Sequence, residues 1–262
     1  MVEVTVLSDN TVAESRPVGL VGEWGFAAAV GDVLFDTGQS DAAYHNAGLL
    51  DCETRFDTIV LSHGHQDHTG GLPEFLVDEP TVVLHPEAWT PRYNHGDHIG
   101  LPYARTKIEH EADVVEHRDP REVSSGIWAL GEIPREYPDN PAGEKPVDGT
   151  RVGDHVVDDQ SLAIETDDGV GLVLGCCHAG LRNTVEYAEA VLEDDVRAII
   201  GGTHLSGMDR ADVVETTDWL VEKQSVDLVA PGHCTGFEAE SILRSKLNDR
   251  FRSIGVGTTI DL

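Results

Sequence analysis

Short apolar runs that end in polar or glycine-rich turns follow one another along the chain and predict its strands. In the front half these runs are close together and predict hairpins. Residues 40–50 are small and polar, and we expect a helix there. "FDTIVLS" is mainly apolar and rich in β-branched residues, which is typical of a buried strand. The predicted front-half strands are "VEVTVLSD" (2–9), "FAAAVGDVLFDTG" (26–38, two strands), "FDTIVLS" (56–62) and "TVVLHP" (81–86).

The back half alternates strands with helices. "QSLAIETDDGVGLVLGCCH" (160–178) predicts a hairpin that turns at residues 167–169. The next two strands are predicted within residues 196–204 and 226–236. The first ends at His204 and the second at His233. Helices are expected at 183–194 with Asn183 or Thr184 as cap, at 210–224 with Asp209 as cap, and at about 236–252. Helices packed on the outside of the sheets would bury the apolar faces of both, so the pattern predicts an α/β fold.

Between about residues 89 and 140 the periodicity weakens, and proline, glycine, histidine and aromatic residues become frequent. Such a stretch inside a compact domain is more often a functional insertion than a linker. We therefore expect one domain over residues 1–262, with an insertion at about 89–140 that partly covers a site and sets its specificity.

The charge of the chain is unusual. Among 262 residues there are 48 acidic and 18 basic side chains, which gives a formal net charge of −30. A surface this acidic repels itself in dilute buffer, and salt screens the repulsion. We therefore expect a halophilic protein of a saline cytoplasm. Because no basic stripe is present, nucleic acid is not an expected partner.

No apolar stretch reaches the length of a membrane span, and "MVEVTVLSDN" at the start resembles a strand rather than a signal peptide. We therefore expect a cytoplasmic protein that does not enter the membrane. The four cysteines contain no CxxC pair, and reduced thiols fit a cytosolic chain.

The candidate chemistry centres on "HGHQDH" directly after a predicted buried strand. His63 and His65 are two positions apart and can point at one place, while Asp67 and His68 can face a second. Imidazole nitrogens and carboxylate oxygens suit zinc and similar divalent metals. Three further predicted strands end in histidine-bearing loops, at His178, His204 and His233. Strand ends in α/β folds are where sites gather, so a metal centre is the interpretation that the pattern favours.

At these residues the chain resembles the metallo-β-lactamase fold superfamily. "SHGHQDHTGG" matches the HxHxDH signature, and "LFDTG" and "PGHCTG" occur in the expected order. Together with "GEWGFAAAV", "GEIPR", "DDQSL", "GCCHAGLRNT" and "GGTHL", they look like the branch that includes the archaeal dihydropterin–ribofuranosylaminobenzene 5'-phosphate synthases. The resemblance covers nearly the whole chain. It implies an αββα sandwich of two mixed β-sheets with helices outside.

The resemblance also implies roles for particular residues. His63 and His65 would hold one divalent ion, and Asp67, His68 and His233 a second. Zinc is the expected metal, with manganese or iron as alternatives. Asp36 of "LFDTG" would orient the histidine loop by hydrogen bonds, or simply form a turn.

The remaining candidates leave alternatives open. His178 is expected to be a ligand. Cys176 falls where the superfamily has a bridging aspartate, and would be either a thiolate ligand or a small buried residue. His204 is either a ligand, a proton donor or a substrate contact.

Such a centre supports hydrolysis most simply, by a metal-bound hydroxide that attacks a small anionic phosphate ester or cyclic ester and is oriented by Asp67. One alternative is a transferase that joins a dihydropterin pyrophosphate to ribofuranosylaminobenzene 5'-phosphate, and another is a non-catalytic metal-binding protein. The substrate would be a small molecule, and the sequence does not predict the oligomeric state. Arg182 and Asn183, at a helix start, and Arg92 and Tyr93, in the insertion, are candidates for substrate binding.

Overall fold

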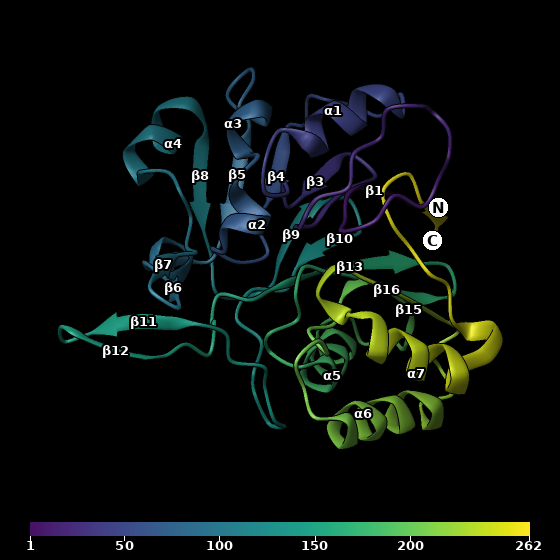
Figure 1. Ribbon diagram of the computed structural model, residues 1–262. Coiled ribbons are helices and arrows are strands. Elements are labelled where there is room, and N and C mark those ends of the chain that lie inside the picture. Colours follow the sequence, from purple (N-terminus) through teal and green to yellow (C-terminus); the bar gives the residue numbers. More distant parts are fainter.

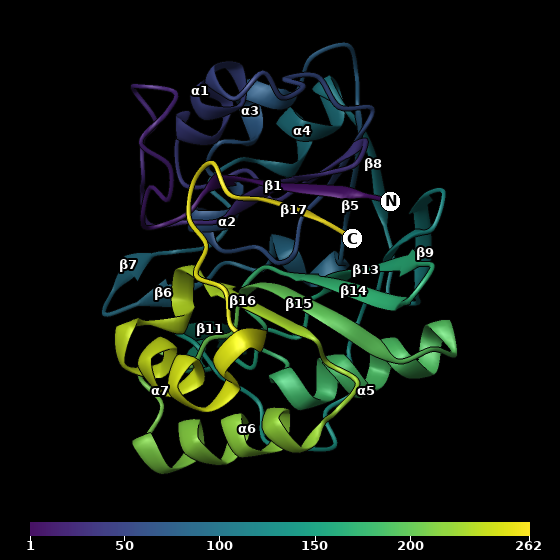
Figure 2. The same ribbon diagram turned by 90° about the vertical axis from the view of Figure 1, so that its right-hand side faces the viewer.

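A computed structural model describes all residues from Met1 to Leu262. Two large β-sheets lie face to face, and helices cover the outer face of each (Figures 1 and 2). The predicted αββα architecture is therefore confirmed. No helix combines the length and the apolar character that a membrane crossing requires.

The first sheet has seven strands and comes mainly from the front half of the chain. Its strands β3, β4, β5 and β8 run parallel, and β17, β1 and β2 are antiparallel to their neighbours. In order across the sheet they are β17 (Thr259–Asp261), β1 (Glu3–Ser8), β2 (Ala27–Val30), β3 (Val33–Phe35), β4 (Thr58–Val60), β5 (Thr81–Leu84) and β8 (Asp113–Glu116).

The second sheet has six strands and comes mainly from the back half. Strands β14, β15 and β16 run parallel, and the remaining pairs are antiparallel. In order they are β16 (Leu228–Gly232), β15 (Val196–Gly202), β14 (Gly169–Leu174), β13 (Ser161–Thr166), β10 (Ile127–Ala129) and β9 (Arg121–Ser124). A separate small sheet has the order β12 (Thr150–Gly153), β11 (Glu144–Val147), β6 (Tyr93–Asn94) and β7 (Asp97–His98).

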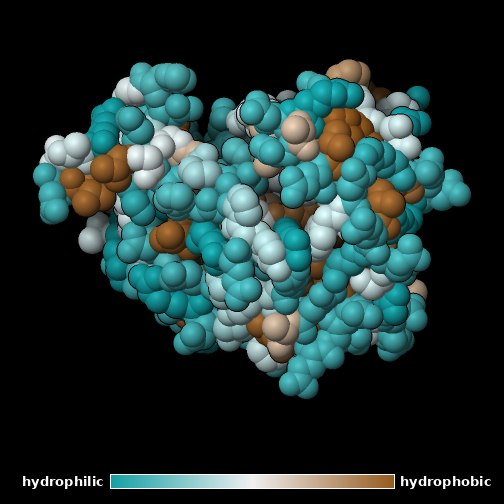
Figure 3. Space-filling model, turned by 90° about the horizontal axis from the view of Figure 1, so that it is seen from below, coloured by the Kyte–Doolittle hydropathy of each residue, from teal (hydrophilic) through white to brown (hydrophobic).

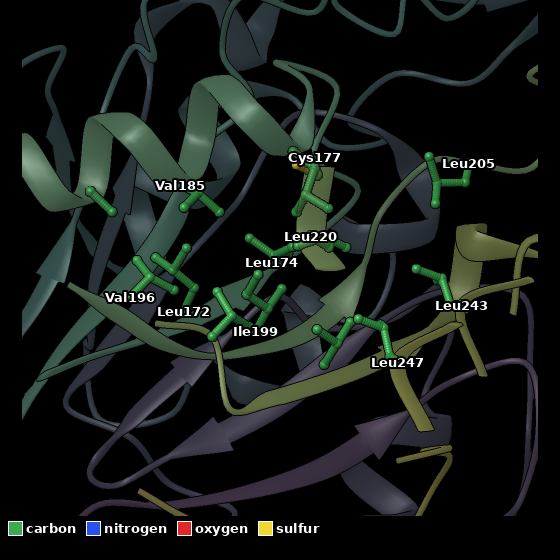
Figure 4. Packing of buried hydrophobic residues seen from close by; sticks show 14 of the residues in the cluster. Leu172, Leu174, Cys177, Val185, Val196, Ile199, Leu205, Leu220, Leu243 and Leu247 are labelled. Atoms are coloured by element: carbon green, nitrogen blue, oxygen red, sulfur yellow. The ribbon is translucent and has the colours of Figure 1, made fainter. Parts of the chain in front are cut away.

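Three apolar layers hold the sandwich together. Phe35, Val173 and Ile200 belong to the layer between the sheets. A second layer packs the first sheet against α1 (Ala42–Leu49), α3 (Leu72–Phe75) and α4 (Arg105–Glu111). The third packs the second sheet against α5 (Leu181–Leu192), α6 (Arg210–Glu222) and α7 (Phe237–Leu247), as Figure 4 shows. Central strands such as β2 and β14 are buried along their whole length, which explains their continuous apolar runs.

Outside these layers the molecule is strongly hydrophilic. The face seen from the side of α6 is mostly polar, with small separate apolar patches (Figure 3). This is the distribution that the net charge of −30 requires.

One sequence prediction about a helix end needs correction, and a second is confirmed in position only. Helix α5 begins at Leu181, with Gly180 at its cap position with a φ of +91°, and neither Asn183 nor Thr184 caps it. The Asn183 side chain instead accepts hydrogen bonds from the Glu136 and Tyr137 amides. Asp209 does occupy the cap position of α6, but its side chain makes no capping hydrogen bond.

The segment 89–140 is also different from the single insertion that the sequence suggested. Helix α4 packs on the first sheet, strand β8 completes that sheet, and β9 and β10 complete the second, so the part of the segment from α4 to β10 belongs to the sandwich. The parts that lie outside it are the β6–β7 hairpin and the loop that follows β10 (Figure 1).

Candidate metal centre

The predicted ligands meet where strands of both sheets end. His63 and His65 follow β4, and His178 follows β14. Asp67 and His68 lie in the short helix α2 (Gln66–Thr69), and His233 directly follows β16. Because parallel strands present their carboxyl ends at one edge, residues far apart in sequence are brought together there.

The first group contains His63, His65 and His178, all buried. One nitrogen from each ring lies within 4.8 Å of the others. Nε2 of His63 is 2.9 Å from Nδ1 of His65. The spacing of two residues after a strand therefore does aim both imidazoles at one point.

The second group contains Asp67, His68 and His233. Nε2 of His68 is 3.2 Å from Nε2 of His233, and a carboxylate oxygen of Asp67 lies 3.5 Å from the same atom of His233. The Cys176 sulfur is 3.2 Å from Nε2 of His68 and also lies within 4.8 Å of a His63 ring nitrogen. Cys176 thus stands between the two groups.

The hydrogen bonds behind the rings fix which nitrogens carry protons. The Ser62 hydroxyl donates to Asp36 and so accepts from Nδ1 of His63. Nδ1 of His178 donates to the Asn140 carbonyl, and Nδ1 of His233 donates to the Asn10 side-chain oxygen. In neutral rings, each Nε2 therefore keeps a lone pair that points inward.

These inward lone pairs fit a cation. Nε2 of His178 is buried without any hydrogen-bond partner. Buried acceptors without donors are costly unless something positive lies between them. The donor set, imidazole with a carboxylate and a thiol, matches divalent metals such as zinc.

Burial keeps most of these rings neutral, which is the form that binds a metal. It lowers the pKa of His65 and of His233 to about 3, and that of His63 and His178 well below the usual value. Burial also acts on His68, but the Asp36 and Asp67 carboxylates outweigh it and raise its pKa to about 9. Without a cation this ring is therefore charged and can donate from Nε2 to His233, and a bound ion would take the place of that proton. The same burial raises the pKa of the Cys176 thiol, so without a nearby cation that thiol stays protonated.

Comparison with known proteins shows the family to which the chain belongs. No protein-family model matches the chain. An uncharacterized protein of Methanocaldococcus jannaschii, MJ0448, is 31% identical over 256 residues, covering 94% of this chain and 95% of its own. From the same organism, the 7,8-dihydropterin-6-methyl-4-(beta-D-ribofuranosyl)-aminobenzene-5'-phosphate synthase is 32% identical over 248 residues, covering 87% and 83%.

A solved structure matches the whole fold. Tm1679, a metal-dependent hydrolase of the β-lactamase superfamily, superposes with a TM-score of 0.89 at 26% identity, covering 100% of this chain and 99% of its own. The chain belongs to the metallo-β-lactamase fold superfamily. It lies in the branch that contains the archaeal synthase, and its buried histidine, cysteine and aspartate clusters are consistent with metal binding.

Asp36 lies beneath the candidate metal centre, as the resemblance implied. One carboxylate oxygen accepts the Ser62 amide at 2.7 Å, and the other accepts the Ser62 hydroxyl and Nδ1 of His68 at 2.6 and 2.7 Å. A single buried carboxylate thus orients one histidine from each group.

A second support, which the sequence did not reveal, comes from "DDQ" before β13. Asp158 accepts the Gly64 amide at 2.8 Å, and Asp159 accepts the Ala179 amide at 2.9 Å. Gln160 donates to the Leu61 carbonyl at 3.0 Å. We call residues 158–160 the brace, because they tie the loop of His63 and His65 to the loop of His178. The motif was visible in the sequence, but nothing in it indicated these partners.

Arg92 completes the brace instead of contacting a substrate. Its guanidinium is fully buried and forms ion pairs with Asp154 and Asp158. Lys145 also contacts Asp154, at 3.2 Å. The structure therefore does not place Arg92 where a substrate can reach it, and its position instead stabilises the carboxylate that holds Gly64.

Of the other expected substrate contacts, two are covered by neighbouring groups and one is exposed. Asn183 is buried and hydrogen-bonded to the backbone, and the Tyr93 ring is covered by Arg151 at 3.9 Å. Arg182 is exposed, but it donates to Glu186 and to the Tyr137 hydroxyl. The contacts of Asn183 and Tyr93 give no support to the substrate-binding role that the sequence suggested for them, and Arg182 is already paired with a carboxylate.

A pocket of about 390 Å³ opens above the metal groups. His65, Asp67, Cys176, His178, His204 and His233 line it from below. Trp24, which the sequence analysis did not single out, lies at its rim with its ring 5.3 Å from that of His233. The His204 ring lies beside that of His178, with centroids 4.3 Å apart and planes tilted by 48°, but His204 belongs to neither group. It lines the pocket, as a substrate contact or proton donor would.

Proposed function

We propose that this protein is a metal-dependent hydrolase whose substrate is a small anionic phosphate ester or a cyclic ester. The observation that carries the proposal is the set of inward imidazole lone pairs beside Asp67 at the floor of an open pocket. Two divalent ions, zinc in the first place, would lower the pKa of water and polarise the attacked oxygen.

The chain's own residues then have separate tasks. His63, His65 and His178 would hold one ion, and Asp67, His68 and His233 the other, with Cys176 as an additional ligand between them. Asp67, whose side chain is 20% exposed, would orient the nucleophile. His204 would contact the substrate or donate a proton to the leaving group.

The alternative is a transferase that joins a dihydropterin pyrophosphate to ribofuranosylaminobenzene 5'-phosphate. The similarity to the archaeal synthase, which covers 87% of this chain, favours it. Such a reaction needs room for two organic substrates, whereas hydrolysis needs room for one and water.

The test is an assay in high salt on bis(4-nitrophenyl) phosphate and on a lactone, with zinc or manganese added. We expect turnover of at least one substrate that His65→Ala abolishes and His110→Ala leaves unchanged, since His110 is exposed on α4. Condensation of the two pterin-pathway substrates without hydrolysis would favour the transferase. Stoichiometric metal without either reaction would contradict both and indicate a non-catalytic metal-binding protein.

A further inference from the structure

Cys234 lies at the metal pocket, and neither of the two ligand groups described above contains it. It directly follows His233, and it lines the pocket together with Cys176. The two sulfurs and a ring nitrogen of His233 all lie within 4.8 Å of one another. We call Cys176 and Cys234 the thiol pair, because two thiols this close in an open pocket can react with each other.

The backbone holds the Cys234 sulfur against the loop of Cys176. This sulfur lies 3.6 Å from the Cys176 carbonyl oxygen, to which it donates, and it accepts the His204 amide at 3.3 Å. Gly202 ends β15, the strand between β14 and β16, and a Cβ atom there would lie only 2.8 Å from the Cys234 sulfur. The missing side chain therefore lets this sulfur reach across β15 towards Cys176.

The other two cysteines are not placed to join the pair. Cys177 points away from the pocket into the apolar layer beneath α5 (Figure 4), and its sulfur lies 3.4 Å from the Thr184 hydroxyl. Cys52 is half-buried against the outer layer of the first sheet. Of the four thiols in the chain, Cys176 and Cys234 are thus the two that share a pocket.

A disulfide joins sulfurs about 2.05 Å apart. Because the two side chains are short and each rotates about its Cα–Cβ bond, rotation can close the remaining distance between the sulfurs. In a cytosol kept reducing, disulfides are usually transient and catalytic or redox-sensing. A pair that lines a working pocket suits the sensing type better than a permanent crosslink.

We propose that the thiol pair is a reversible oxidation site, which hydrogen peroxide converts into a Cys176–Cys234 disulfide. One thiol attacks the peroxide O–O bond and becomes a sulfenic acid, and a water molecule leaves. The second thiol attacks that sulfur, the S–S bond forms, and the sulfenic oxygen leaves as a second water molecule. The two sulfurs lose two electrons, the two peroxide oxygens gain them, and the thiol protons leave in the water.

The disulfide would take Cys176 away from the metal groups. Its sulfur is 3.2 Å from Nε2 of His68 and lies within 4.8 Å of a His63 ring nitrogen, so it stands between both groups. A thiolate binds metals, whereas a disulfide sulfur has no negative charge to offer. Metal affinity would therefore fall on oxidation and return on reduction. The crosslink itself does not rest on the proposed hydrolysis, because the sulfurs are close whatever the pocket binds.

The test is treatment of the full chain with hydrogen peroxide in high salt, followed by mass spectrometry without reductant. We expect a chain lighter by two hydrogen atoms, with two fewer thiols open to alkylation, and dithiothreitol should restore the original mass. In cobalt-substituted protein, the thiolate charge-transfer band should disappear as the crosslink forms and return on reduction. Cys234→Ser should abolish the crosslink, and its Cys176 should instead proceed to a sulfinic acid that dithiothreitol does not reverse.

Cys177→Ala and Cys52→Ser are the matched controls, and both should keep the crosslink and its reversal. A crosslink that persists in Cys234→Ser, overoxidation of the unaltered chain without a crosslink, or a cobalt band that survives the crosslink would overturn the inference. If Cys234→Ser fails to fold, fragmentation of the crosslinked peptides from the unaltered chain still shows whether Cys176 or Cys177 is joined. A crosslink in a protein that hydrolyses no ester would leave this inference standing and reject the proposed function alone.

Discussion

Asp158→Asn is the substitution that tests the brace most sharply. The Asp158 carboxylate accepts the Gly64 amide at 2.8 Å with one oxygen and an Arg92 N–H with the other. Asparagine has the same shape but only one acceptor oxygen. It can keep one of these bonds, and its amide hydrogens then face the other donor.

The cost follows from burial. A lost hydrogen bond to a charged group costs about 1.5–3 kcal/mol, and breaking a buried ion pair costs about 3–5 kcal/mol. Arg92 keeps Asp154 as partner, although Lys145 shares that carboxylate, so the loss is partial. We expect about 3 kcal/mol less unfolding free energy, or a melting temperature lower by about 6–12 °C in a chain of this size.

The same substitution should weaken metal binding, because Gly64 separates His63 and His65, which both belong to the first group. Loss of such a support typically costs about 10–100-fold in metal affinity. Chemical unfolding in high salt and metal-competition titration measure the two effects. Asp78→Asn is the matched control, since its ion pair with Arg55 is exposed and should contribute at most about 1 kcal/mol. If Asp158→Asn behaves like this control in both assays, the brace has no such role.

Three other expectations are quickly tested. Cys176→Ser should remove the thiolate charge-transfer band of the cobalt-substituted protein, and a band that persists would exclude Cys176 as a ligand. Metal-free protein should unfold at lower urea concentration at pH 5 than at pH 7, because His65 and His233, with a pKa of about 3 when folded against 6.5 as the ordinary value, bind protons only on unfolding. The opposite trend would contradict the inference that His65 and His233 are neutral in the folded protein. Lowering salt below roughly 0.5 M should lower the melting temperature, whereas indifference to salt would reject the halophilic interpretation.

The sequence predicted those ligands of the metal centre that a short stretch of sequence is enough to recognise. His63, His65, Asp67 and His68 lie within six positions after an apolar run, and His178 and His233 end strands of the same kind. Since each apolar run is buried on both faces, its end must lie at a sheet edge, and the family resemblance indicated that the ends meet.

Other features depend on partners that no local pattern reveals. Arg92 lies in a stretch of weak periodicity and resembles a surface residue, but Asp154 and Asp158, 62 and 66 positions later, compensate its charge and allow it to be buried. Asn183 looks like a helix cap because its true partners, the amides of residues 136 and 137, lie in a distant loop. Strands β8 to β10 are only three or four residues long, too short for alternation to distinguish them from an insertion.

The central claim is that the histidine cluster holds two divalent ions that the reaction needs. The most direct measurement is metal content per chain by mass spectrometry, made on one preparation together with its turnover of bis(4-nitrophenyl) phosphate. We predict two ions per chain, loss of turnover on chelation, recovery with zinc or manganese, and loss of metal in His65→Ala. Turnover that survives complete removal of metal, or a chain that binds none, would contradict it.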